Sequence, residues 1–544
     1  MPGSSTSTDR FRGFVHVADG ELVDGSGNIL RLRGVGLGNW LLPEGYMWKF
    51  EPGGPLSPRQ IESFICGLVG QQRSDEFWRE FRERYITEDD VARMAAEGFD
   101  HVRVAINSRI VLTENGDLIE DGFALIDRLI NWCRAHGLWV VLDLHGAPGG
   151  QTGTNIDDSP HGLPELFTDD NYLRLTIDLW RAIATRYRDE TVVAGYDLLN
   201  EPLPNEYQHL YVNELASLYK EITAAIREID ENHVIIYEGT HWSNNWSLFT
   251  EVWDLNSMLQ CHKYWNPPDR ASVRQYVEKA AAFGLPVYMG ETGENNLDWM
   301  QTAFQLYEDS GMSWNLWPWK KIDTVTSPCS VDPPDGWTAL VEYARGVTDV
   351  RPTSEQAWTV LCDLLERLDL SRCTYRQDVV NAVMRRAPLR IPASGFGFRG
   401  PGLSYQTSGA TPLPGYRRDD QVSLECDNLD ADGAPTFGHN HGQPRLPQDE
   451  IVVRLAPHDW VAYEVELTSA SVVDIVVAAD LGRAPSRVPL AISFADERLA
   501  DVAVRDGFVV GSTGAKAGAG RHHLKVEAGP NPVVVRWIDV AVRA

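Results

Sequence analysis

Up to Trp317 the chain repeats one pattern, in which a short apolar run is followed by a longer stretch with a helical period. Eight of these runs are short and continuous enough in their apolar character to be buried parallel strands. They cover Arg33–Gly36, His101–Ile106, Trp139–Leu144, Val193–Leu199, Val234–Tyr237, Met258–Tyr264, Val287–Glu291 and Met312–Trp317. Eight strands separated by helices predict an α/β fold, a closed (β/α)8 or TIM barrel, rather than an open sheet.

The helices are predicted between and after these runs. Thr87 stands three residues ahead of Asp90 in a capping-box arrangement, which predicts a helix over Thr87–Glu97. Other helices are predicted over Ala124–His136, Asn171–Tyr187, Gln208–Asp230, Glu355–Leu370 and Asp378–Arg386. A hairpin is expected over Phe14–Leu32, and a long loop that overhangs the carboxyl ends of the strands is expected over Lys320–Pro334.

The composition of the chain changes near Arg390, where glycine and proline become frequent. Short β-like runs follow without a helical period between them, over Asp459–Val465, Val472–Ala478, Leu490–Phe494 and Val533–Val542. They predict an all-β sandwich. Because 544 residues are too many for one ordinary core, we expect two domains. These are a barrel with its hairpin and added helices over 1–388, and the sandwich over 389–544.

The formal net charge of −28 limits the partners of the chain. It argues against nucleic acid and anionic membranes and favours a neutral ligand, a class to which small glycosides and oligosaccharides belong. No run of about 18 apolar residues is present, so no membrane span is expected. The first residues form no apolar signal segment, and the seven cysteines are odd in number and lack metal-like spacing. These features favour a cytoplasmic location, while the oligomeric state stays open.

Two of the apolar runs lead to a glutamate. Glu201 follows the fourth run within Asn200-Glu201-Pro202, and Glu291 ends the seventh run after Gly290. The carboxyl ends of barrel strands meet on one face, where barrel enzymes keep their sites. A glycosidase needs two carboxyl groups there, one to protonate the leaving oxygen and one, in retaining enzymes about 5–5.5 Å away, to attack the sugar. Their pKa values must differ, so that one is neutral while the other is ionised.

Further polar or aromatic residues lie near the ends of other runs, namely Arg103, His145, Asn200, His262, Tyr264 and Trp317. Arg103 is expected to lower the pKa of a nearby carboxylate, Asn200 to bind a sugar hydroxyl and Trp317 to form the floor beneath a sugar ring. Taken alone, each has a simpler explanation: a carboxylate in solvent, an arginine paired with an acid at the barrel mouth, structural histidines or a core tryptophan. Their coincidence at the ends of six strands favours a catalytic site.

To about residue 340 the chain resembles glycoside hydrolase family 5, within a clan of retaining barrel glycosidases. Asn200-Glu201-Pro202 is similar to the family's acid/base motif, and Gly290-Glu291 is similar to its nucleophile motif. The resemblance also places active-site roles on Arg103, His145, His262, Tyr264 and Trp317. It implies no cofactor and no metal.

Within that family the pattern is most similar to the exo-β-1,3-glucanase and β-glucosidase branch. The segments that carry this resemblance are Arg33–Glu44, Leu142–Gln151 and Trp317–Lys320. In that branch, residues that match Glu44 and Tyr46 hold the terminal glucose, which implies a pocket for a non-reducing end and hence exo action. The segment Thr152–Gly162 looks longer than its counterpart, so the side that holds the leaving group is expected to differ.

We therefore expect a retaining exo-acting β-glycosidase similar to a β-glucosidase. Glu201 is expected to act as acid and base, and Glu291 as nucleophile held ionised by Arg103 and Tyr264. The same chemistry on a disaccharide glycoside, a glucosyl lipid, a β-1,3-glucan or a β-mannoside stays open. A carbohydrate-binding protein without catalysis is the alternative from a different class.

The C-terminal region faintly resembles carbohydrate-binding modules of the family 6 type, through Ile391–Phe396, Gly415–Val422 and Asp459–Tyr463. Trp460 and Trp537 lie on apolar runs and are expected in the core, so no tryptophan platform for a sugar is predicted. Packing against the barrel is favoured over independent sugar binding. Whether the sandwich binds sugar or calcium, or contributes to the active site, stays open.

Overall fold

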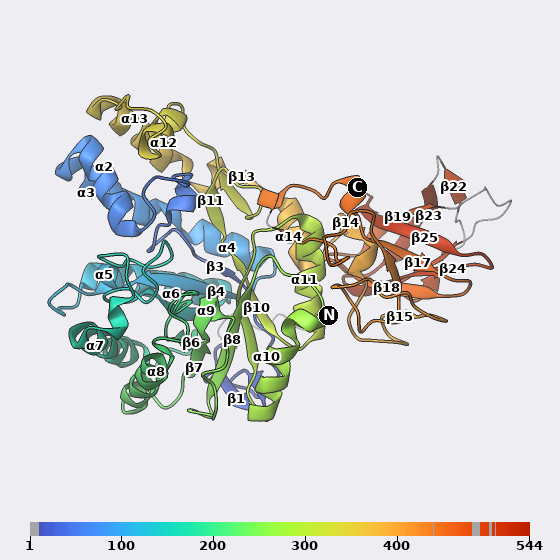
Figure 1. Cartoon of the computed structure of the whole chain (residues 1–544), viewed down its shortest axis with the longest axis horizontal. Coiled ribbons are helices and arrows are strands. Elements are labelled where there is room, and N and C mark those ends of the chain that lie inside the picture. The colour runs from blue at the N-terminus through green and yellow to red at the C-terminus, as the bar shows by residue number, and fades with distance from the viewer. Residues whose placement is uncertain (1–9, 439, 481–489, 500–502, 506–507, 544) are drawn as a thin grey trace. The chain divides into compact units, whose positions relative to one another are not determined.

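The computed structural model describes residues 10–438, 440–480, 490–499, 503–505 and 508–543 (Figure 1). The chain divides into two compact units that interleave along the sequence. The first comprises Met1–Lys263, Glu278–Thr292 and Ser313–Tyr375, and the second comprises Tyr264–Val277, Gly293–Met312 and Arg376–Ala544. The domain boundary predicted at residue 388 stays a prediction.

The first unit is built on a closed eight-stranded barrel with the order β10-β3-β4-β5-β6-β7-β8-β9 (Figure 1). Its strands are β3 (Arg33–Gly36), β4 (His101–Asn107), β5 (Trp139–Gly146), β6 (Val193–Asp197), β7 (Val234–Glu238), β8 (Ser257–Lys263), β9 (Val287–Gly293) and β10 (Ser313–Trp317). All eight predicted strands are confirmed, each end within two residues. Every residue of β4 and β5 is buried, as expected for parallel strands that are covered on both faces.

Helices alternate with these strands along the chain. They are α4 (Glu88–Ala96), α5 (Ser108–Val111), α6 (Glu120–His136), α7 (Asp170–Tyr187), α8 (Val212–Arg227), α9 (Thr240–Ser243), α10 (Arg270–Phe283) and α11 (Leu297–Asp309). The predicted capping box is confirmed, because the Thr87 N–H donates to Asp90 Oδ2 at 3.0 Å. Among the described residues, no helix is both long and apolar enough to cross a membrane.

The elements predicted before and after the barrel strands in the sequence are also present. The N-terminal hairpin is confirmed as β1 (His16–Ala18) and β2 (Glu21–Val23), which pair antiparallel. After β10 come α12 (Trp337–Ala344), α13 (Ser354–Arg367) and α14 (Gln377–Met384), and the last two confirm the two helices predicted there.

Between β3 and β4 the structure has two helices that the sequence analysis does not predict, α2 (Pro58–Val69) and α3 (Gln71–Tyr85). A capping box at Ser57 starts α2, and Gly70 joins the helices with a φ of +84°, which glycine adopts without steric cost. On α3, Phe77 and Phe81 pack against Trp48, with ring centroids 6.2 and 5.3 Å apart. These three rings form an aromatic cluster within the first unit.

The loop predicted over Lys320–Pro334 is wrong in part. Its ends pair as two short parallel strands, β11 (Lys320–Ile322) and β12 (Cys329–Val331), and β12 pairs antiparallel with β13 (Thr374–Tyr375). The Lys320 ammonium is fully buried, lies 2.7 Å from Asp90 Oδ1 and donates to the backbone oxygen of Tyr85 at 2.8 Å. These contacts tie the segment to α4 through Asp90 and to α3 through Tyr85.

The second unit contains two antiparallel sheets, which confirm the predicted all-β sandwich. One has the order β16-β17-β25-β19-β23-β22, with β14 paired to β25, and the other has the order β15-β18-β24-β20-β21. Their strands are β14 (Leu389–Pro392), β15 (Tyr405–Gln406), β16 (Ser423–Glu425), β17 (Val452–Leu455), β18 (Trp460–Leu467), β19 (Ser471–Asp480), β20 (Leu490–Phe494), β21 (Glu497–Arg498), β22 (Ala503–Arg505), β23 (Phe508–Ala517), β24 (Gly520–Ala528) and β25 (Val533–Val542).

The expectation that Trp460 and Trp537 lie in the sandwich core is wrong, because both side chains are partly exposed. A register shift between β19 and β25 turns Trp537 out of the buried set of its strand, and Trp460 is the first residue of β18. Each indole is instead covered by a cation. Lys525 lies 4.5 Å from the ring centroid of Trp460, and Arg390 lies 4.0 Å from that of Trp537.

Candidate active site

Arg103 on β4 is fully buried inside the barrel. Its guanidinium contacts side chains at the carboxyl ends of several other strands. Its Nη1 donates to Glu291 Oε1 at 2.5 Å, on β9. Its Nε donates to Asp197 Oδ2 at 2.7 Å, and its Nη2 donates to Asn200 Oδ1 at 2.8 Å. One guanidinium therefore fixes the orientation of the seventh-strand glutamate relative to the residue that precedes Glu201.

Three further carboxyl groups crowd around the same guanidinium, and each is fully buried. Besides Asp197, they are Asp143, whose Oδ2 lies 3.2 Å from Arg103 Nη2, and Glu238, whose Oε1 lies 3.0 Å from it. Burial raises the pKa of Asp143 to about 7 and that of Asp197 to about 6, against the opposing charge of Arg103. Burial also raises the pKa of Glu238 well above its usual value. One cation thus serves four carboxyl groups, and part of the cluster keeps protons near neutral pH.

Glu201, His262 and Glu291 form a compact group at the mouth of this cluster. His262 Nδ1 lies 2.7 Å from Glu201 Oε1 and 3.8 Å from Glu291 Oε2. One carboxylate oxygen of each glutamate and one nitrogen of His262 all lie within 4.8 Å of one another. The carboxyl pair therefore has the short separation of retaining glycosidases rather than the about 6.5–9.5 Å of inverting ones. Such a trio also suits a cation, but His262 and Glu201 already satisfy each other directly.

The two glutamates differ in their surroundings. Burial raises the pKa of Glu201 to about 7, and the described hydrogen bond of its carboxylate is to the neutral imidazole of His262. Burial also raises the pKa of Glu291, but the positive charge of Arg103, which contacts the carboxylate directly, opposes this rise. Glu291 is therefore the ionised member of the pair, and Glu201 is the member that holds a proton near neutral pH.

The tautomer of His262 follows from its other neighbour. Burial lowers the pKa of His262 to about 3, so the ring is neutral. The amide Nε2 of Gln260 lies 2.9 Å from His262 Nε2, and an amide nitrogen can only donate there. The imidazole proton is then on Nδ1, where it faces Glu201 Oε1.

His145 joins the catalytic cluster to an aromatic wall. Burial lowers the pKa of His145 to about 4, and its Nδ1 lies 2.7 Å from Asp143 Oδ2. Its Nε2 lies 3.2 Å from the side-chain nitrogen of Asn200. The imidazole stacks on Trp317, with ring centroids 5.2 Å apart and planes 6° apart, and the Trp317 N–H donates to the Tyr46 hydroxyl at 3.1 Å.

The first-strand motif supplies the space that Trp317 occupies. A Cβ at Gly36 would lie 2.3 Å from the Trp317 ring, and one at Gly38 would lie 2.6 Å from it. Only glycine permits this approach. Glu44, which precedes the short 3-10 helix Gly45–Trp48 that carries Tyr46, is 2% exposed. Tyr46 and Trp317 are thus joined to the cluster through His145, and Glu44 lies two residues before Tyr46 in the sequence.

Tyr264 is the first residue of the second unit, just beyond β8. Its backbone oxygen accepts a hydrogen bond from Asn295 Nδ2 at 3.0 Å within that unit. The predicted role of Tyr264 beside Glu291 stays a prediction.

The sequence pattern did not identify four polar residues of the cluster: Asp143, Asp197, Glu238 and Gln260. Asp143 and Asp197 lie within the predicted third and fourth strands, where alternate side chains point into the barrel. Glu238 is the last residue of β7, one position beyond the predicted fifth strand. The signal for it was available, because all the other strands from the second to the eighth end near polar groups.

The loop Thr152–Gly162 is ordered by its own aspartates. Asp157 Oδ2 accepts the N–H groups of Thr152 and Gly153 at 2.6 and 3.0 Å. Just before the loop, Gln151 Nε2 donates to the backbone oxygens of His145 and Asn200 at 2.6 and 3.0 Å. The loop therefore begins from a residue bound directly to two strand ends of the site.

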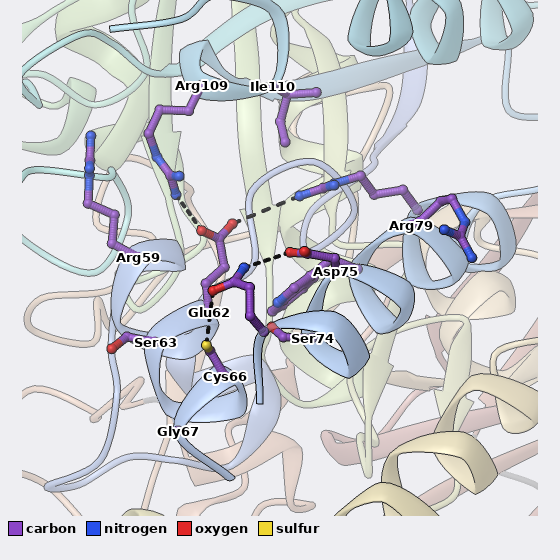
Figure 2. A pocket seen from close by; sticks show the side chains of 13 residues that line it. Arg59, Glu62, Ser63, Cys66, Gly67, Ser74, Asp75, Arg79, Arg109 and Ile110 are labelled. Carbon is purple, nitrogen blue, oxygen red and sulfur yellow. Dashed lines mark hydrogen bonds and ion pairs between the residues drawn. The ribbon is translucent and has the colours of Figure 1, made fainter. Parts of the chain in front are cut away.

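A hollow of about 860 Å³ lies on α2, α3 and α5 (Figure 2). Figure 2 shows Glu62 directed toward Arg109, whose Nη2 lies 2.9 Å from Glu62 Oε2. Arg109 and Arg59 also pair with Asp158 of the loop. None of the strand-end residues described above lines this hollow, so it is separate from the catalytic cluster.

The sequence model of the family described as Cellulase (glycosyl hydrolase family 5) matches residues 66–323, which hold β4 to β10 and both glutamates. Residues 66–323 of the chain belong to glycoside hydrolase family 5. The resemblance inferred from its strand-end motifs is confirmed, and the chain is a glycoside hydrolase.

Known relatives of this family 5 chain differ in the sugar for which they are named. A beta-xylosidase of Phanerodontia chrysosporium is 29% identical over 348 residues, which cover 57% of this chain and 71% of the relative. A probable glucan 1,3-beta-glucosidase A of Aspergillus clavatus is 27% identical over 275 residues, 48% of this chain and 64% of the relative. The chain thus spans less than two thirds of that glucosidase.

Among solved structures, Cel5A of Thermotoga maritima in complex with cellobiose is 18% identical to this family 5 chain, with a TM-score of 0.43. That similarity covers 65% of this chain and 97% of the other.

Proposed function

We propose that this family 5 enzyme is a retaining exo-acting β-glycosidase similar to a β-glucosidase. The observation that carries the proposal is the asymmetric carboxyl pair. Oxygens of Glu201 and Glu291 lie within 4.8 Å of each other, and only Glu291 has a described contact to the Arg103 guanidinium. An inverting mechanism needs a wider separation, about 6.5–9.5 Å, because both a water molecule and the anomeric carbon must fit between the two carboxyl groups.

The first step would form a covalent glycosyl-enzyme. Glu291 Oε attacks the anomeric carbon, and the bond from that carbon to the leaving oxygen breaks. Glu201 gives its proton to the leaving oxygen, so the aglycone departs as a neutral alcohol. Because His262 donates to Glu201 Oε1, the transferable proton is assigned to Oε2.

The second step would reverse the roles around the same carbon. Glu201, now an anion, takes a proton from a water molecule whose oxygen attacks the anomeric carbon. The bond to Glu291 breaks, and the sugar leaves with its original configuration. Arg103 stabilises the Glu291 carboxylate at the start and at the end of this cycle.

We assign the sugar hydroxyls at the cleavage site to Glu44, Tyr46, His145 and Asn200, with Trp317 beneath the ring. His262, which the sequence also pointed to, has Gln260 and Glu201 on its two nitrogens and borders the same site. Support comes from the hydrogen bond of Tyr46 to Trp317 and the stacking of His145 on the same indole, which join them in one wall. The beta-xylosidase and the glucan 1,3-beta-glucosidase are each named for one sugar, which supports a pocket for one terminal sugar.

Hydrolysis of a panel of para-nitrophenyl glycosides tests the proposal, with β-glucoside, β-xyloside, β-mannoside and a disaccharide glycoside. We expect the β-glucoside to react fastest, and NMR during the reaction to show the β-anomer of glucose first. Release from the disaccharide glycoside alone would contradict the one-sugar pocket. The α-anomer appearing first would contradict retention, and inertness of the folded protein toward every glycoside would contradict the assigned activity.

A further inference from the structure

The backbone at Glu201 has an unusual conformation. Its φ is +44°, in the left-handed region that residues other than glycine rarely adopt, and Leu203 has a φ of +58°. Pro202 between them has no N–H to donate. This turn is what aims the Glu201 side chain, so whatever stabilises the turn also sets the direction of the carboxyl group.

A carboxylate from the neighbouring strand stabilises this turn. The Glu201 N–H donates to Glu238 Oε2 at 2.7 Å. The N–H groups on either side bind backbone oxygens instead, Asn200 that of Leu144 and Leu203 that of Gln151. Among the described contacts of the turn, Glu238 is therefore the side chain that accepts a backbone N–H.

The other oxygen of Glu238 is anchored within the catalytic cluster. Its Oε1 accepts hydrogen bonds from Arg103 Nη2, at 3.0 Å, and from the Gln260 amide. The same amide donates to His262, whose Nδ1 faces the Glu201 carboxylate at 2.7 Å. Glu238 thus reaches Glu201 twice, directly at its backbone and indirectly at its carboxyl group.

We propose that Glu238 is a positioning residue for the acid/base step, which holds Glu201 in the turn that points its proton at the leaving oxygen. This inference rests on the proposed function. It adds a residue on β7, the strand that carries none of the groups expected to touch the sugar. A Glu238 that only fills the barrel core would affect both catalytic glutamates, and the folding of the barrel, without regard to the leaving group.

The test compares Glu238→Gln with the unaltered enzyme on two β-glucosides. A glutamine at this position must direct its NH2 either at the Glu201 N–H or at the Arg103 and Gln260 donors, so one set of contacts is lost in either orientation. A phenyl leaving group needs a proton from Glu201, whereas a 2,4-dinitrophenyl group leaves with little help. We expect kcat/KM to fall about tenfold or more for the phenyl glucoside and about threefold or less for the dinitrophenyl glucoside.

Equal falls on the two substrates would overturn the inference while leaving the glycosidase assignment intact. If the unaltered enzyme hydrolyses neither glucoside, the proposed function itself fails. In a Glu201→Ala background, adding Glu238→Gln should leave phenyl glucoside hydrolysis unchanged within about twofold, because the positioned proton is already gone. A further tenfold fall there would contradict action through Glu201.

Asp230→Asn is the matched control, at the opposite end of the same barrel segment. Asp230 is buried and lies 2.6 Å from His233 Nδ1, just ahead of β7. Its replacement should lower the melting temperature without changing the ratio of the two kcat/KM values. If Glu238→Gln does not fold, Glu238→Asp serves instead, since it keeps the carboxyl group and withdraws its oxygens, and the same change in the ratio is expected.

Discussion

Arg103 places its Nη1 2.5 Å from Oε1 of Glu291. Glu291 and Glu201 are otherwise both buried. The contact distinguishes the two glutamates, because Glu201 meets a neutral histidine where Glu291 meets a permanent cation. The same sequence feature, a strand ending on glutamate, therefore yields two different acids. The roles of acid and nucleophile that we propose for them rest on this contact.

Replacing Glu291 by glycine should abolish turnover of an aryl β-glucoside, with a fall of about 10⁴-fold or more, because no nucleophile remains to form the covalent intermediate. Added azide should restore part of the activity by attacking from the vacated side, and it should give a glycosyl azide of inverted configuration. Product NMR identifies that azide. Glu114→Gln, at a side chain that is 82% exposed, should remain fully active, and full activity of Glu291→Gly would refute the assignment.

The rate should fall on the alkaline side of neutrality. The pKa of Glu201 is raised to about 7 by burial, and the acid step needs its protonated form, so kcat/KM is expected to decline as pH rises through about 7. In Glu201→Ala the alkaline limb should disappear because the titrating group is gone. A dinitrophenyl glucoside is used for this comparison because its leaving group needs little acid assistance, so the variant still hydrolyses it. A pH profile of both proteins between pH 5 and 9 checks this, and an unchanged alkaline limb in the variant would assign the limb to another group.

Arg103→Met should destabilise the fold, by about 3–5 kcal/mol, because it leaves buried carboxyl groups without their cation. The loss should be larger at pH 8 than at pH 5. The pKa values of Asp197 and Asp143 are raised to about 6 and about 7, so these groups are neutral at the lower pH and tend to ionise at the higher one. Denaturant unfolding at both pH values measures the difference.

A matched arginine at the surface provides the control for that experiment. Arg186→Met removes an exposed pair with Asp127 and should cost less than about 1 kcal/mol at either pH. A loss from Arg103→Met that is the same at pH 5 and pH 8 would contradict the shared ion-pair cluster.

Gly38→Ala should disturb the aromatic wall, because the new Cβ would lie 2.6 Å from the Trp317 ring. We expect kcat/KM for the β-glucoside to fall about tenfold as Trp317 and the stacked His145 shift. Gly67→Ala on α2 is the control, since nothing lies within 4 Å of a Cβ there and alanine favours a helix. Steady-state kinetics of both variants check the prediction, and equal activity would show that Trp317 can move at no cost.

The barrel was predictable because each strand is a buried parallel run with a clear helix after it. The pair α2 and α3 escaped prediction because Gly70 interrupts the helical period and α3 is mostly charged on its outer face. The segment of β11 and β12 is tied to α4 by Lys320 and Asp90, a contact between residues that are far apart in the sequence. No local pattern reports such a contact.

Glu201 and Glu291 were predictable as polar groups at strand ends, but the cluster around Arg103 was not. Asp143 and Asp197 lie opposite each other on β5 and β6, and Glu238 lies opposite Gln260 on β7 and β8. Only the register of neighbouring strands shows that these groups share one guanidinium. An aspartate within an apolar run otherwise indicates a polar position without identifying its partner.

The crowding of carboxyl groups around Arg103 also has an effect on titration. Whenever one member of the group releases its proton, the new negative charge makes the next release harder, as Asp143 does for Asp197. Ionisation is therefore anticooperative and extends over a wider pH range than that of a single group. The total negative charge around Arg103 therefore changes gradually with pH. The electrostatic potential at Glu291 changes gradually with it.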